Sequence, residues 1–117
     1  MQHDLIRLQH MLDAGKDALQ FALGRERTHL ENDRMLALAL IKALEIIGEA
    51  ASKVSENFKS EHPEIPWIEI TGMRNRMIHA YYDVNLDVVW QTIKSDLPDL
   101  LKSIEKILMR NKNYGYA

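Results

Sequence analysis

The sequence has no cysteine among its 117 residues, which excludes disulfides, thiol nucleophiles and thiolate metal sites. Its five glycines are scattered along the chain, so no glycine-rich loop of the kind that holds nucleotide phosphates is present. The G-x-S-x-G turn that presents the nucleophile of many serine hydrolases is also missing. These absences exclude enzymes that use a thiol, enzymes that hold nucleotide phosphates in a glycine-rich loop, and serine hydrolases of the G-x-S-x-G type.

Long apolar runs are lacking too. The longest, Met35–Ile41, is far too short to span a bilayer. The first residues, Met1–Asp4, are not basic, and no apolar segment follows them as a secretory signal would require. We therefore expect a cytoplasmic protein without a membrane segment.

Metal-ligand spacings and a strong excess of positive charge are absent as well. The five histidines do not pair with one another or with carboxylates in a pattern such as H-E-x-x-H. The sequence therefore predicts no metal site and no cofactor.

Fifteen basic residues stand against 17 acidic ones, a formal net charge of −2. Such a balance argues against a broad nucleic-acid footprint, so any RNA contact must be local.

The residues that are present favour a small helical protein. Apolar residues make up 46% of the sequence, and its length predicts one domain, residues 1–117, with a modest core. Apolar positions recur at three- and four-residue steps, and no segment shows the alternation of a strand. We therefore predict an all-α fold, an antiparallel bundle of four to five helices.

The predicted helices cover residues 3–23, about 33–54, 67–79 and 86–109. The predicted non-helical segments are a polar loop at 25–31, the proline-containing stretch 55–66 and a break at 80–84. Asn32 or Asp33 can cap the second helix, and Asn85 can cap the last one. Pro98 should kink the last helix or restart it after Asp96.

The second helix is the most apolar, so we expect it to be central and buried on more than one side, with Met35 and Ile46 part of its apolar surface. Gly15 and Gly48 lie inside predicted helices, where glycine costs about 1 kcal/mol relative to alanine. This cost indicates close packing at both positions.

Two carboxylates, Glu45 and Glu49, lie one turn apart within this apolar helix. A carboxylate in such surroundings needs solvent or a partner. In one interpretation both residues reach water or pair with an arginine. In a sharper one, Glu49 lines a polar site and orients Arg74 or His79.

The segment Met73–Asp83 concentrates the side chains that are capable of chemistry. Arg74 and Arg76 are permanent cations with planar donor groups suited to phosphate, and His79 can transfer protons near neutral pH. An ideal helix would place Arg74 and His79 about 140° apart around its axis. They would converge only through the length of the arginine, or if the helix ended near His79. A purely structural interpretation, a polar cap at a helix end, accounts for the same residue types.

The pattern is more specific than its residue types. Arg74, His79 and Tyr81 form the motif R-x4-H-x-Y, which resembles the signature of the HepT-like family of the HEPN superfamily. Further stretches resemble that family in the same order along the chain: Leu8–Ala14, Ile47–Ala51, His62–Trp67, Gly72–Tyr82, Val89–Trp90 and Asp96–Pro98.

This resemblance implies a HEPN-like helical bundle that forms a homodimer, with two motifs facing each other in one cleft. It implies a metal-independent endoribonuclease toxin that cleaves RNA, with tRNA as a target. Arg74 and His79 would be catalytic, and Arg74 would bind the RNA phosphate. Beyond what the resemblance implies, we expect Asn75 to hold the motif in shape and Glu49 to support it, while Arg76 could contact RNA or the partner or simply be solvated. The implied antitoxin is an MntA-type nucleotidyltransferase that silences the nuclease by transferring AMP from ATP to Tyr81.

Two other interpretations remain open. The chain could be a non-catalytic helical module that dimerises and binds a nucleotidyltransferase. The same cationic cluster could alternatively bind a nucleotide without cleaving RNA. Replacing His79 with alanine separates the first alternative from the enzyme, since a scaffold should tolerate that change.

Overall fold

Helices account for nearly all of the residues that the computed structural model describes, which are 2–83 and 85–111. The side chains of Gln2 and of residues 78–83 also lie outside the description. The elements are α1 (Gln2–Ala22), α2 (His29–Asn32), α3 (Arg34–Ser52), α4 (Glu56–Glu61), α5 (Trp67–Asp83), α6 (Leu86–Gln91), the π-helical turn η1 (Thr92–Asp96) and α7 (Leu97–Arg110). The predicted all-α class is confirmed for this part of the chain.

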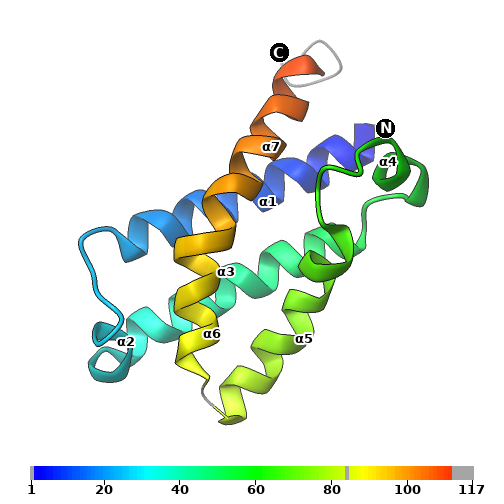
Figure 1. Ribbon diagram of the computed structural model, residues 1–117. Coiled ribbons are helices and arrows are strands. Elements are labelled where there is room, and N and C mark those ends of the chain that lie inside the picture. The colour runs from blue at the N-terminus through cyan, green and yellow to red at the C-terminus, as the bar shows by residue number, and fades with distance from the viewer. Residues whose placement is uncertain (1, 84, 112–117) are drawn as a thin grey trace.

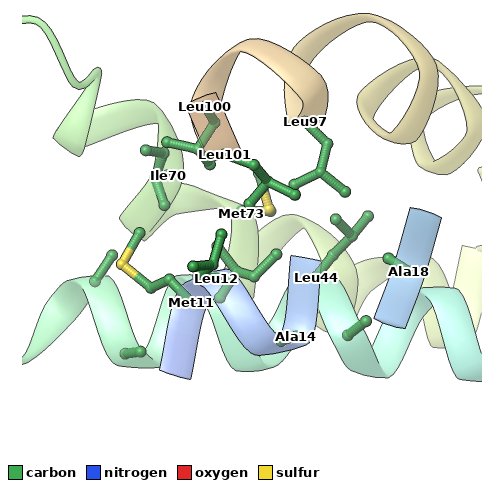
Figure 2. Close-up of a cluster of buried hydrophobic side chains, with 14 of the residues drawn as sticks. Met11, Leu12, Ala14, Ala18, Leu44, Ile70, Met73, Leu97, Leu100 and Leu101 are labelled. Carbon is green, nitrogen blue, oxygen red and sulfur yellow. The ribbon is translucent and has the colours of Figure 1, made fainter. Parts of the chain in front are cut away.

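The long helices are arranged in two layers. In the first, α3 lies between α1 and α5 and packs against both of them. In the second, α6, η1 and α7 run as one continuous rod across this layer (Figure 1). Leucines of α7 point down onto α1, α3 and α5, where they meet Met11, Leu44 and Met73 in the buried core (Figure 2).

The predicted helix starts are confirmed where capping side chains are described. Asp33 precedes α3, and its side chain accepts a hydrogen bond from the backbone nitrogen of Leu36. Asn85 does the same for α6 through the backbone nitrogen of Val88. Pro98 occupies the first turn of α7, which begins directly after Asp96 as predicted. No break precedes it, because the π-helical turn η1 joins α6 to α7.

Two short helices replace segments that were predicted to be non-helical. The first, α2, overlaps the end of the supposed loop 25–31 and buries Leu30. The second, α4, precedes Pro63 and buries Phe58. The prediction for 55–66 was wrong because a proline restricts itself and the residue before it, here His62, and leaves earlier residues free to form a helix.

The predicted break at 80–84 is wrong as well, because α5 continues to Asp83. The reason lies in the sequence, which has no proline or glycine between Ala80 and Asp83 to end the helix. The prediction of four to five helices was therefore too low for the described residues, where α2 and α4 are added and the last helix divides around η1.

The first layer leaves one face of α3 uncovered. Met35 and Ile46, both predicted to belong to its apolar surface, are 79% and 41% exposed. The helix is central, as predicted, but its neighbours α1 and α5 pack on its two flanks while the second layer covers only one side. None of the described helices is both long and apolar enough to cross a bilayer.

Both internal glycines lie at close contacts, as predicted. A Cβ atom at Gly15 would lie 2.4 Å from the Leu101 side chain. A Cβ atom at Gly48 would lie 2.7 Å from the backbone nitrogen of Arg74 and 3.0 Å from the carbonyl oxygen of Ile70. The contact at Gly48 is the more demanding of the two, because the α5 backbone cannot rotate away as a leucine side chain can. Glycine at position 48 therefore sets the spacing of α3 and α5.

We expect Gly48→Ala to lower the free energy of unfolding by about 1–3 kcal/mol, because the added methyl group must push α5 away. Denaturant unfolding followed by circular dichroism measures the change. Gly72→Ala is the matched control, since a Cβ atom there would have no neighbour within 4 Å. That variant should be neutral, or stabilised by up to about 1 kcal/mol through helix propensity. Equal stability of the two variants would contradict the role given to Gly48.

Candidate functional site

The close contact of α3 with α5 places Arg74 beside Glu49. Gly48 lies against the backbone of Arg74, so the next residue of α3, Glu49, comes within reach of the arginine side chain. Arg74 Nη1 donates a hydrogen bond to Glu49 Oε2 at 2.5 Å. The two side chains remain 43% and 42% exposed, so the pair lies at the surface. The contact with Arg74 suggested for Glu49 is thus present, while its supporting role in catalysis stays a prediction.

Glu49 is also close to a second cation. Lys53, the C-cap residue of α3, has its Nζ 3.7 Å from Glu49 Oε1. The hydrogen bond from Arg74 lowers the pKa of the Glu49 carboxyl, and the charges of Arg74 and Lys53 add to this effect, while partial burial opposes it. The stabilisation from this ion pair is therefore complete above the ordinary carboxyl pKa of 4.5 and is lost as the pH falls through the lowered value.

Arg76 lies on a different side of α5 from Arg74. Its Nη2 donates to the carbonyl oxygen of Glu69 at 3.2 Å. It lines a surface pocket of about 450 Å³ between α5, η1 and α7, whose other charged residues are all acidic: Glu64, Glu69, Asp96 and Asp99. The structure therefore does not bring the two arginines together, and RNA binding by Arg76 remains a prediction without geometric support.

The remaining motif residues lie further along α5. Asn75 is exposed. The backbones of His79 and Tyr81 are helical, and their side chains lie outside the described residues. Because α5 does not end near His79, the backbone positions of Arg74 and His79 keep the separation of about 140° expected for an ideal helix. Within one chain, only the length of Arg74 can bring the two side chains together.

A second pocket, of about 270 Å³, lies on the outer surface of α1 and α3 and was not predicted from the sequence. It is lined by Arg7, His10, Lys42, Glu45, Ile46, Glu49, Ala50 and Lys53. No spacing in the sequence could have revealed it, because its basic residues come from distant segments that only the packing of α1 against α3 brings together. Glu49 belongs both to this pocket and to the ion pair with Arg74.

Among the residues that the structure describes, no group of three or more histidine, cysteine, aspartate or glutamate side chains is placed to hold a metal ion. The acidic residues around Arg76 do not form such a group either, although they share one pocket.

Comparison with known proteins identifies the family. The sequence model of the family described as "Ribonuclease HepT-like" matches residues 11–107, a range that includes both members of the Arg74–Glu49 pair. The chain belongs to the HepT-like ribonuclease family. This confirms the resemblance drawn from the sequence motifs.

Individual relatives agree with this assignment to the HepT-like family. A protein of Thermococcus cleftensis named "Probable ribonuclease HepT" is 48% identical over 75 residues, 64% of this chain and 68% of the relative. One from Caldanaerobacter subterraneus named "Putative RNase TTE0752" is 35% identical over 105 residues, 90% and 94% of the two chains. One from Methanocaldococcus jannaschii named "Putative RNase MJ1380" is 34% identical over 98 residues, 84% and 90%. No solved structure matches significantly.

The geometry of this HepT-like chain suits Arg74 for contact with a phosphate. Its guanidinium is planar and presents several N–H donors. Among the described contacts only Nη1 donates to Glu49, so the other donors can serve the oxygens of a ligand. The pair with Glu49 holds the side chain in one orientation, which lowers the entropy lost when a ligand binds.

We expect Arg74→Ala to raise the pKa of Glu49 toward its ordinary value, since the largest cause of the lowering is the hydrogen bond from Arg74. A carbon-13 NMR titration of the carboxyl group measures this directly. Lys53→Ala provides the comparison and should give a smaller rise, because Lys53 lies farther away at 3.7 Å. A rise in Lys53→Ala equal to or larger than that in Arg74→Ala would show that the Arg74 contact is not the dominant one in solution.

Proposed function

We propose that this protein is a metal-independent endoribonuclease that cleaves RNA in a cleft shared by two copies of the chain. The observation that supports this most directly is the exposed guanidinium of Arg74, fixed by Glu49 on the helix that also contains His79. Membership of the HepT-like ribonuclease family points to the same activity. Arg74 and His79 are the proposed catalytic residues.

Cleavage of RNA without a metal needs two proton transfers. The ribose 2′-oxygen loses its proton and attacks the phosphorus, the bond to the 5′-oxygen breaks, and that oxygen gains a proton. The products are a cyclic 2′,3′-phosphate and a free 5′-hydroxyl. Histidine suits either transfer near neutral pH. Arg74 would stabilise the negative charge that accumulates on the phosphorane oxygens.

A two-fold dimer would supply the second proton-transfer group. The motif offers one histidine per chain, and α5 separates the backbone positions of Arg74 and His79 by about 140°. A two-fold axis brings identical residues of two copies together. A cleft between two copies can therefore hold two His79 residues, one acting as the base and the other as the acid.

We further propose that the nuclease is the toxin of a toxin–antitoxin pair and that tRNA is among its substrates. The antitoxin would be an MntA-type nucleotidyltransferase that transfers AMP from ATP to the hydroxyl of Tyr81, releasing pyrophosphate. Tyr81 lies two residues beyond His79 in α5, so this transfer would put a bulky anion beside the cleft. That anion would compete with the RNA phosphate for Arg74.

We expect the purified, unmodified protein to cleave total tRNA in EDTA. His79→Ala should lower the rate about 10²–10⁴-fold, the usual contribution of proton transfer, and Arg74→Ala about 10²–10³-fold through lost charge stabilisation. Lys102→Ala, an exposed change on α7, is the control and should cleave normally. Gel electrophoresis measures the rates, and intact mass confirms that Tyr81 is free of AMP. Intact tRNA with every protein would contradict the enzyme and favour the binding module.

The shared cleft can be tested with dimers of defined composition. If both His79 residues act in one cleft, a heterodimer of wild-type and His79→Ala chains should be nearly as inactive as the mutant homodimer. Two independent sites would instead leave about half of the activity. Dimers isolated through two different affinity tags allow the comparison. A heterodimer of wild-type and Lys102→Ala chains controls for the tags and should be fully active.

A further inference from the structure

The pocket on the outer surface of α1 and α3 lies next to the candidate active site. Glu49 lines this pocket and also accepts a hydrogen bond from Arg74, so one carboxylate joins the pocket to the candidate active site. Arg7 and His10 come from α1, Lys42 from α3 and Lys53 from the residue that caps the end of α3. Arg7, Lys42 and Lys53 in the pocket, and Arg74 through its contact with Glu49, thus bring cationic side chains to one region of the surface, although the chain as a whole is slightly acidic.

The cations of this surface are weakly engaged by protein groups. Lys42 Nζ lies 3.4 Å from Glu45, and Lys53 Nζ lies 3.7 Å from Glu49. Both pairs join residues three or four positions apart in the chain, with lysine side chains 60% and 51% exposed, and exposed pairs of this kind contribute little to stability. Arg7 makes no ion pair with any residue that the structure describes. Phosphates spaced along a strand can therefore recruit these three cations at small cost.

The two sides of α5 differ in charge. On the side of Arg74, four cationic residues (Arg7, Lys42, Lys53 and Arg74) stand against two carboxylates. On the side of Arg76, the pocket is lined by four carboxylates and a single arginine. An RNA strand held at Arg74 is repelled from the second side and attracted to the first. The strand can therefore extend from Arg74 across Glu49 into the pocket between α1 and α3.

We propose that this pocket is a subsite for RNA backbone phosphates that flank the scissile one. Arg7 and Lys53 bind the phosphate nearest to Arg74, His10 donates a ring N–H at the rim, and Lys42 meets the strand beyond. This inference rests on the proposed function, because it assumes that RNA is cleaved at Arg74. It adds that affinity for RNA depends on residues far from the R-x4-H-x-Y motif.

The test compares Arg7→Ala, Lys53→Ala and the double variant with Lys102→Ala, which removes the same charge from exposed α7. All are made in a His79→Ala background so that RNA stays intact. The probe is a fluorescent single strand of about 12 nucleotides, and anisotropy gives Kd over a range of salt concentrations. Each subsite variant should weaken binding about tenfold. Each should also reduce the slope of log Kd against log salt by about 0.7, whereas Lys102→Ala should change neither.

Catalytic rates with His79 present give a second readout. The subsite variants should lower the ratio of kcat/KM on the oligonucleotide to kcat/KM on a dinucleotide, because a dinucleotide has no flanking phosphate. A general structural defect would lower both values together and leave the ratio unchanged. Should Arg7→Ala fail to fold, as judged by circular dichroism, Lys42→Ala with Lys53→Ala tests the same surface through two exposed side chains.

Three results would overturn the subsite. The first is RNA binding by the double variant that equals RNA binding by Lys102→Ala, although the wild-type protein cleaves tRNA. In that case the subsite is wrong and the proposed nuclease activity stands. The second is a double variant whose dimer dissociates in sedimentation experiments while its RNA binding is unchanged. That result would make this surface an interface between protein chains. The third is absence of both tRNA cleavage and RNA binding in the parent proteins, which overturns the proposed function together with the subsite.

Discussion

The close approach of α3 and α5 at Gly48 is the constraint on which the candidate site depends. Two helices normally pack 8–10 Å apart, with side chains between them. Here a glycine faces the α5 backbone at Arg74 and Ile70 directly, so the residue after it can reach across to Arg74. The Glu49–Arg74 pair is therefore a consequence of backbone spacing, and the orientation of Arg74 is determined by the same packing that builds the core.

Much of this arrangement was predictable from local sequence. Asp33 and Asn85 start helices because their side chains satisfy backbone nitrogens within the next turn, and the cost of glycine within a helix already indicated a tight contact at position 48. The failures also have local causes. The helix α4 and the end of α5 were misjudged because prolines and polar residues were taken to disturb more of the chain than they do.

What sequence could not supply was the relation between segments. Arg74 and Arg76 look equivalent in the motif, yet they lie on different sides of α5, one beside Glu49 and the other among carboxylates. Two residues along a helix correspond to about 200° of rotation, so only the positions of α3 and α7 decide what each arginine meets. Likewise, Arg7 and Lys53 share a pocket only because α1 packs against α3.

The uneven distribution of charge reconciles a slightly acidic chain with the proposed RNA substrate. A ribonuclease needs positive potential only along the path of the strand, and negative charge elsewhere repels RNA from unproductive positions. In this fold α5 separates the positive region from the negative one. Its α3 side presents Arg74 beside Glu49, which lines the pocket between α1 and α3, while its α7 side presents carboxylates. The net charge of −2 therefore does not argue against RNA binding once the helices are in place.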